Sequence, residues 1–257
     1  MKSKTNRLDR FIAQHSDYSI SDTRVLISQN RILLDGSLAN SIQQKVTAFT
    51  RVVLDGKCLQ DDTPVYIKLN KPMGVVSATK DNTHATVMDL IKHPQKNDLH
   101  IVGRLDFNTT GLVLLTNDGK WSRKISLPET KLEKTYEVTL SKPLTEEYIA
   151  AFLEGIYFTY ENITTQPAHL EIISDYKAKL SLVEGKYHQV KRMFGHFQNE
   201  VLALHRISVG GIALDGLEIG SSRLLTKAEI STNEHQHAYN NVKTGTHSQS
   251  INASLAG

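Results

Sequence analysis

Cysteine is nearly absent from this chain of 257 residues, which holds only Cys58. A single thiol excludes a disulfide within the chain and a thiolate metal cluster, as is usual for proteins of a reducing compartment. Long apolar runs are also missing, because no stretch approaches the roughly 18 residues that cross a bilayer. The N-terminal residues alternate basic and polar types without the apolar core of a signal peptide. We therefore expect a soluble cytoplasmic protein.

Nucleotide-binding and metal-binding patterns are missing as well. The sequence contains neither a Walker loop nor the glycine fingerprint of a dinucleotide-binding fold. Its histidines occur at spacings that match no common helical or hairpin metal site. We therefore expect neither a cofactor nor a bound metal.

The formal charge of +3 is small but unevenly distributed. Residues 1–60 hold nine basic against five acidic side chains, a net charge of +4, and the rest of the chain sums to −1. A mild net charge does not by itself indicate nucleic-acid binding. A basic segment at one end of the chain is nevertheless typical of the electrostatic footprint of an RNA-binding protein.

The N-terminal segment has the pattern of a small module. Residues 7–15 carry apolar side chains at helical spacing, and Ser21 is placed to cap a second short helix. Residues 31–36 and 50–56 each read as a strand that enters an Asp-Gly turn. The basic side chains that could form one face for RNA phosphates are Arg7, Arg10, Arg24, Arg31 and Lys45. Ordinary solvated surface charge is the alternative interpretation for each of them.

The rest of the chain has an α+β pattern. From Val65 onward, short strands rich in Val, Ile, Leu and Tyr alternate with few helical stretches and with tight turns. After about Thr232 the sequence has too few apolar residues to offset the entropy of ordering. The sequence predicts a small module at 1–60, a domain at 61–231 with a mixed, largely antiparallel sheet, and a disordered tail at 232–257.

The segment Gly103–Gly119 is the most informative one. It places a polar loop that contains one aspartate, Asp106, between two apolar strands. A loop that is held by a rigid sheet is the usual location of catalytic side chains. Composition alone also permits the simpler interpretation that Asp106 caps a turn.

This segment closely resembles the catalytic motif of the pseudouridine synthases, in particular the RsuA-type family, which joins an S4-type RNA-binding domain to a synthase domain. The module at 5–58 resembles the S4-type domain, and the resemblance extends to about residue 230. Residues 121–123 and 187–193 most resemble the members that act on 16S ribosomal RNA. The further matching segments, in chain order, are Tyr66-Ile-Lys-Leu-Asn-Lys-Pro-Met-Gly-Val-Val-Ser, Glu133-Lys-Thr-Tyr-Glu-Val and Gly185-Lys-Tyr-His-Gln-Val-Lys-Arg-Met-Phe.

The resemblance implies that Asp106 is the catalytic aspartate of a uridine isomerisation that needs no cofactor. The carboxylate would attack C1′ of the ribose covalently or remove a ribose proton to give a glycal, and the sequence leaves both routes open. A nearby cation would keep the carboxylate ionised. The resemblance places this cation at Lys191 or Arg192 and favours Lys191, while the other residue would contact RNA phosphate.

The resemblance assigns further residues to the site. It implies that Tyr136 stacks on the target base and supports proton transfer at C5, although a tyrosine in an apolar strand is ordinarily part of the core. It implies that Arg104 enters the space left by the extruded nucleotide, with a structural salt bridge as the alternative. Lys71 is expected at the pocket entrance near an RNA phosphate, and His188 is expected near the pocket.

Three alternatives compete with this interpretation. The first is a non-catalytic S4-type RNA-binding protein of the ribosome, and the second is a synthase that acts on 23S ribosomal RNA. The third, a glycoside hydrolase, would need a second acidic residue, for which only Asp118 or Glu133 could be nominated. The expected partner is ribosomal RNA, preferably 16S RNA, either free or within a partly assembled small subunit. A monomer is the default oligomeric state.

Overall fold

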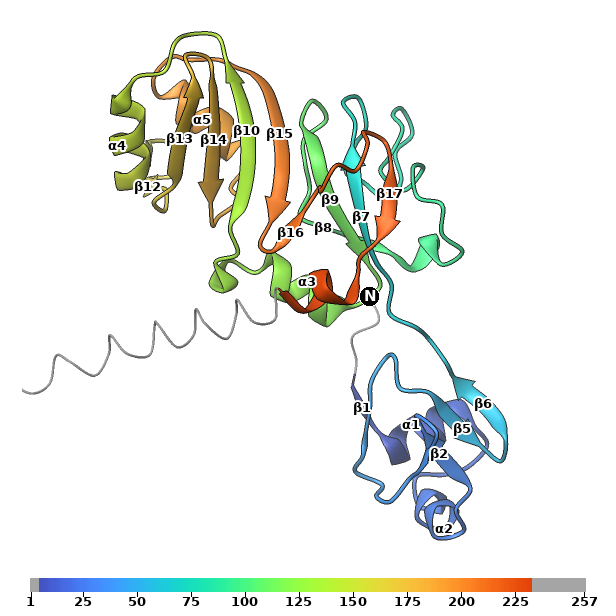
Figure 1. Cartoon of the computed structure of the whole chain (residues 1–257). Coiled ribbons are helices and arrows are strands. Elements are labelled where there is room, and N and C mark those ends of the chain that lie inside the picture. The colour runs from blue at the N-terminus through green and yellow to red at the C-terminus, as the bar shows by residue number, and fades with distance from the viewer. Residues whose placement is uncertain (1–4, 233–257) are drawn as a thin grey trace, which may run out of the picture. The chain divides into compact units, whose positions relative to one another are not determined.

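The chain divides into two compact units in the computed structural model, which describes residues 5–232 (Figure 1). The first unit ends at Val65 and includes Asn117–Lys120, and the second holds Tyr66–Thr116 and the residues from Trp121 on. The tail predicted at 232–257 lies outside the described residues, apart from Thr232.

The first unit packs two short helices against small antiparallel sheets. A four-stranded sheet has the order β3-β2-β5-β6, and β1 pairs with β4. Asp35 and Asp55 both have positive φ, as do the glycines that follow them, and such pairs form the tight turns of the β2–β3 and β5–β6 hairpins. The elements are β1 (Asn6–Arg7), α1 (Leu8–His15), α2 (Asp22–Ser28), β2 (Ile32–Leu34), β3 (Ser37–Leu38), β4 (Lys45–Val46), β5 (Val52–Leu54) and β6 (Lys57–Gln60).

The apolar core of this unit comes from the predicted amphipathic segments. The residues of α1 at helical spacing are buried, and they pack on the inward side chains of the strands. The second helix starts directly after Ser21, as the sequence predicts, but the Ser21 hydroxyl makes no capping hydrogen bond. The main buried side chains are Leu8, Phe11, Ile12, Leu26, Ile32, Val46, Val52 and Leu54.

The second unit is built on a nine-stranded mixed sheet. Its main path has the order β13-β14-β10-β15-β9-β7-β17, with β16 on β15 and β8 on β9. Among the described strands of this sheet, only β9 and β15 pair in parallel, which confirms the prediction of a mixed, largely antiparallel sheet. Its strands are β7 (Tyr66–Lys71), β8 (His100–Val102), β9 (Thr110–Thr116), β10 (Lys134–Leu140), β13 (His169–Ser174), β14 (Lys177–Leu182), β15 (Val201–Val209), β16 (Ile212–Ala213) and β17 (Ser222–Leu224).

Two helices cover one part of this sheet, beside β10, β13 and β14 (Figure 1). Phe152 of α4 and Phe194 of α5 are fully buried, and their rings meet edge to face at 4.9 Å. This contact holds the C-terminal end of α5 against α4. The remaining elements are η1 (Lys96–Asp98), α3 (Gly119–Ser126), η2 (Pro128–Thr130), α4 (Glu146–Glu154), the hairpin β11 (Tyr157–Phe158) and β12 (Ile163–Thr164), and α5 (Gln189–Gly195). None of the helices within residues 5–232 is long and apolar enough to span a membrane.

The parallel junction of β9 and β15 brings two backbones unusually close. Gly111 of β9 lies opposite Arg206 of β15 and has φ +107°. A Cβ atom at this position would lie 2.3 Å from the backbone oxygen of Arg206. Only glycine therefore allows the two halves of the sheet to join here.

Replacing Gly111 with alanine is expected to lower the free energy of unfolding by roughly 3 kcal/mol or more, since both the backbone clash and the positive φ oppose a side chain. The matched control is Gly195→Ala in α5, where a Cβ atom meets nothing within 4 Å. That variant should stay within about 1 kcal/mol of the parent. Scanning calorimetry measures both, and equal melting temperatures for the two variants would contradict the steric explanation.

Candidate active site

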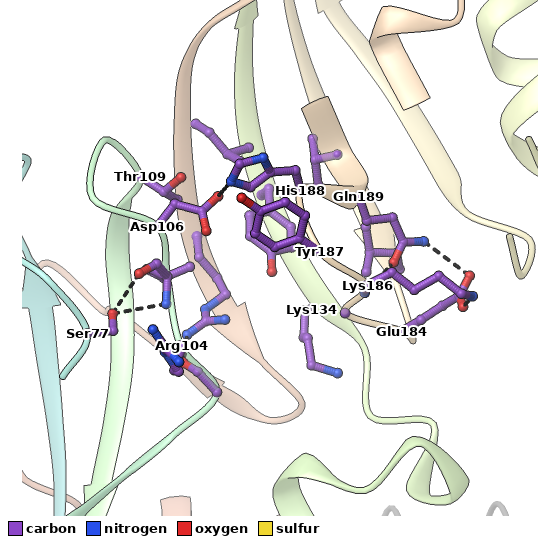
Figure 2. Close-up of a pocket in the computed structure, with 18 of the residues that line it drawn as sticks. Ser77, Arg104, Asp106, Thr109, Lys134, Glu184, Lys186, Tyr187, His188 and Gln189 are labelled. Atoms are coloured by element: carbon purple, nitrogen blue, oxygen red, sulfur yellow. Dashed lines mark hydrogen bonds and ion pairs between the residues drawn. The ribbon is translucent and has the colours of Figure 1, made fainter. Parts of the chain in front are cut away.

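Asp106 lies on the loop between β8 and β9, and the backbone of this loop is held at successive residues. The Ser77 hydroxyl accepts a hydrogen bond from the Leu105 amide at 3.0 Å and donates to the Leu105 carbonyl at 2.7 Å (Figure 2). The Thr109 amide donates to the Asp106 carbonyl at 3.1 Å. The carboxylate is therefore presented from a fixed main chain, while 40% of its side chain remains exposed.

Lys71, at the end of β7, bonds to the backbone of the same loop with its side chain. Its ammonium group donates to the carbonyls of Val75 at 2.7 Å, Pro72 at 3.0 Å and Phe107 at 3.3 Å. Burial lowers the pKa of Lys71 to about 8, against the opposing effect of the Asp106 charge. The expectation that Lys71 lies near an RNA phosphate was wrong for this structure, because its side chain is fully buried and directed at backbone carbonyls. The Lys71 ammonium group is instead packed against the backbone of the Asp106 loop.

The loop opens onto a cavity of about 980 Å³ within the second unit. Strand β10 contributes Tyr136 to the wall, and the register places Tyr136 opposite Arg206 of β15. Tyr136 is only 7% exposed, so the cavity reaches an otherwise buried ring. Arg104 and Lys191 also line the cavity, and the structure thus brings them together with Asp106 and Tyr136.

His188 is the side chain within ion-pair distance of Asp106 among residues 5–232. Its Nε2 atom lies 3.5 Å from the Asp106 carboxylate (Figure 2). The residue precedes α5 and has φ +51°, a conformation that non-glycine residues rarely adopt outside special sites. Its ring stacks on that of Tyr187, with centroids 3.9 Å apart. An exposed aromatic pair therefore borders the cavity beside the candidate carboxylate.

A hydrogen-bond network holds the segment that carries this aromatic pair. The buried Gln189 amide donates to Glu184 at 3.1 Å and accepts from the Lys186 backbone at 3.0 Å. Glu184 also forms an ion pair with the side chain of Lys186. These contacts fix the turn before α5 independently of the Asp106 loop.

The two candidate cations of α5 separate in the structure. Arg192 forms a bidentate ion pair with Glu161, in which Nη1 lies 2.6 Å from the carboxylate, and its guanidinium lies 3.7 Å from the centre of the Phe158 ring. Lys191 lines the cavity instead. Successive helical residues point about 100° apart, so one can face the cavity while the other faces the β11–β12 hairpin. Within residues 5–232 neither Lys191 nor Arg192 forms an ion pair with Asp106, whose ion-pair partner there is His188, and Arg192 is paired with Glu161.

Arg206 is a site residue that sequence reasoning missed. It is 2% exposed, and it donates from Nε to the Leu112 carbonyl at 2.8 Å and from Nη2 to the Gly103 carbonyl at 2.7 Å. These bonds join β15 to β9 and to the start of the Asp106 loop. An arginine within the largely apolar stretch 201–209 was the available signal, since a buried charge needs a specific partner.

The basic residues of the first unit fall into two groups. Arg7 pairs with Asp9, and Arg31 forms a bidentate pair with Asp55 at 2.6 and 2.7 Å and donates to the Tyr18 hydroxyl at 2.6 Å. These hydrogen bonds raise the pKa of Arg31. Three more of the predicted basic residues, Arg10, Arg24 and Lys45, are exposed and form no ion pair within the described residues, and the same holds for Lys57.

Comparison with known proteins supplies the family. A family model described as RNA pseudouridylate synthase matches residues 65–196. The ribosomal small subunit pseudouridine synthase A of Pseudomonas aeruginosa is 48% identical over 226 residues, which covers 87% of this chain and 98% of that protein. The chain belongs to the RNA pseudouridylate synthase family.

Other relatives agree with this assignment. The protein of the same name from Escherichia coli K12 is 42% identical over 228 residues, which covers 88% of this chain and 99% of that protein. A crystal structure of a pseudouridylate synthase, 39% identical, aligns with a TM-score of 0.64 over 88% of this chain and 99% of that chain. As a member of this family, the chain is an enzyme that forms pseudouridine in RNA, and the pseudouridine synthase fold predicted from the sequence is confirmed.

Substituting Ser77 with alanine should lower kcat for pseudouridine formation by roughly ten- to a hundredfold, because it leaves the Leu105 backbone unpaired and frees the Asp106 loop to shift. The control is Thr79→Ala, at an exposed position two residues along the chain. Single-turnover assays on ribosomal RNA transcripts measure the effect. A Ser77→Ala enzyme with the parent kcat would show that loop fixation is dispensable.

Proposed function

We propose that this chain isomerises one uridine of small-subunit (16S) ribosomal RNA to pseudouridine, with Asp106 as the carboxylate that acts at the ribose. The observation that carries the proposal is the position of Asp106, which projects from a backbone-fixed loop into a cavity that also exposes Tyr136 and Lys191. The choice of 16S RNA is supported by relatives named ribosomal small subunit pseudouridine synthase A, which match over nearly their whole length.

The reaction requires three events at the target nucleotide. The glycosidic bond between N1 and C1′ breaks, the uracil turns, and C5 joins C1′. A carboxylate supports this sequence either as a nucleophile on C1′ or as a base that removes a ribose proton. Both routes need Asp106 ionised, and both need the nucleotide extruded from its stack so that C1′ becomes accessible.

The neighbouring side chains have distinct proposed roles. Lys191 supplies positive charge in the cavity and favours the ionised form of Asp106. Tyr136 presents a ring on which the uracil stacks, and its hydroxyl assists proton removal at C5. Arg104 is exposed at the cavity edge, two residues before Asp106, and there it fills the space that the extruded nucleotide vacates.

The first unit is proposed to act as an S4-like RNA-binding domain. Arg7 and Lys45 are cross-strand neighbours in the β1–β4 pair, and Arg10 lies on the adjoining helix α1. Exposed positive charge on neighbouring elements suits phosphate binding, which would position the RNA without reading its sequence. Arg31 and Arg7 contribute less in this arrangement because carboxylates already neutralise them.

The central experiment incubates the purified enzyme with unmodified 16S and 23S transcripts and maps pseudouridine by carbodiimide labelling and primer extension. One new stop in 16S RNA is expected for the parent enzyme and none for Asp106→Asn, whose RNA affinity should stay within several-fold of the parent. Lys191→Gln should lower conversion by roughly tenfold or more, whereas Arg192→Gln, its matched neighbour, should affect stability more than conversion. A stop only in 23S RNA would overturn the substrate, and an active Asp106→Asn enzyme would overturn the mechanism.

A second experiment concerns the first unit. Changing Arg10, Arg24 and Lys45 together to glutamine should weaken RNA binding and flatten its dependence on salt, by roughly 0.7 to 0.9 in the log–log slope for each phosphate that is no longer neutralised. The rate at saturating RNA should be retained because the second unit is unchanged. Filter binding across a salt series provides the test, and an unaltered slope would show that these residues do not bind the RNA.

A further inference from the structure

The cavity extends well past the surroundings of Asp106. Its volume of about 980 Å³ lies at the upper end of the roughly 300–1,000 Å³ usual for small-ligand pockets. Its lining also includes the end of α3, at Ile125 and Ser126, and Lys134 at the start of β10. Figure 2 shows Lys134 apart from the Asp106 carboxylate and from the His188 ring that contacts this carboxylate. The distal part of the cavity therefore has a wall of its own.

Two cations share this wall. Lys134 and Tyr136 are two residues apart on β10 and so point to the same face of the sheet, the face on which Arg206 lies opposite Tyr136. The ammonium group of Lys134 donates to the Leu132 carbonyl at 3.1 Å, which uses one of its three donors. Burial and the charge of Arg206 lower the pKa of Lys134 to about 8. Two positive charges therefore line the same cavity from neighbouring strands.

Neither cation is neutralised by the part of the protein that the structure describes. Within residues 5–232, no carboxylate forms an ion pair with Lys134 or with Arg206. Arg206 is almost completely buried, and it donates from Nε and Nη2 to backbone carbonyls, which carry no formal charge. The carbonyl hydrogen bonds offset part of the desolvation cost of Arg206, but an anion beside a buried and a half-buried cation would also balance their charge.

We propose that Lys134 and Arg206 form an anion subsite that binds a phosphodiester of the RNA segment carrying the target uridine. A phosphodiester brings a full negative charge and several acceptor oxygens, which match a guanidinium and an ammonium group. Every nucleotide that enters the cavity carries such a group, whereas a ground-state uracil is neutral. This inference rests on the proposed function, and it adds a contact that positions the RNA strand at a part of the cavity wall apart from Asp106.

The test is the salt dependence of affinity for an unmodified 16S transcript. The matched variants are Lys134→Gln, Lys134→Arg and Lys177→Gln, the last an exposed lysine on β14 outside the cavity. Lys134→Gln should weaken binding several-fold at about 0.1 M salt and lower the log–log slope by roughly 0.7 to 0.9, the value for one phosphate. Lys134→Arg keeps the positive charge and should have the same slope as the parent. Lys177→Gln removes a charge outside the cavity and should also have the parent slope. Equal melting temperatures would confirm that the variants are folded.

The outcomes separate the alternatives. An unchanged slope for Lys134→Gln, with a fall in kcat alone, would assign the cations to the uracil oxygens during turnover and would overturn the phosphodiester subsite. An equal fall in slope for Lys177→Gln would show that the effect comes from general surface charge, and this result would also overturn the phosphodiester subsite. Absence of pseudouridine with the parent enzyme would refute the proposed function, while the binding comparison would still report on the subsite because it needs no turnover.

Discussion

The geometry of the site depends on the hydrogen bonds of the buried Arg206 guanidinium. Arg206, on β15, donates to the Leu112 carbonyl of β9 and to the Gly103 carbonyl, where the Asp106 loop begins. The desolvation cost of a buried guanidinium is offset by such charge-assisted hydrogen bonds. Because β15 also pairs with β10, the Arg206 side chain connects the Asp106 loop, through β15, to the strand that carries Tyr136. The carboxylate and the ring thus keep a fixed relation across the parallel junction of the sheet.

The two walls of the cavity are made rigid by different means. The Asp106 loop is held by side chains that bond to its backbone, with Ser77 at Leu105 and the buried Lys71 at Phe107. The opposite wall is held by side chains that bond to one another, through Glu184 and Gln189, and by the aromatic packing beneath α5. Independent support of each wall allows a nucleotide to enter between them while the loop keeps its geometry.

Charge is distributed unequally around this cavity. Asp106 and Glu184 are its acidic residues, and Glu184 is already paired with Lys186. The basic lining residues outnumber them, so the net charge of the lining is positive and favours an anionic polymer. The basic lining residues are Arg104, Lys134, Lys186, Lys191 and Arg206.

Much of the fold and part of the site followed from sequence pattern. Alternation and helical spacing located α1, α2 and the hairpin strands of the first unit, since these depend on neighbouring residues and on local turn chemistry at Asp-Gly pairs. The motif around Asp106 likewise identified a loop between two strands. These features are encoded within about ten residues of chain.

Contacts between distant residues decided the remainder. Lys71 was expected near an RNA phosphate, but it is buried and donates to the carbonyl of Phe107, 36 residues away in the sequence. Arg192 forms an ion pair with Glu161, 31 residues away. Arg206 escaped notice because its partners lie 94 and 103 residues away. The sequence by itself determined the helices and hairpin strands of the first unit and the two strands that flank the Asp106 loop. The tertiary structure decided which charges are buried, paired or open to RNA, because burial and pairing are set by neighbours that only folding brings together.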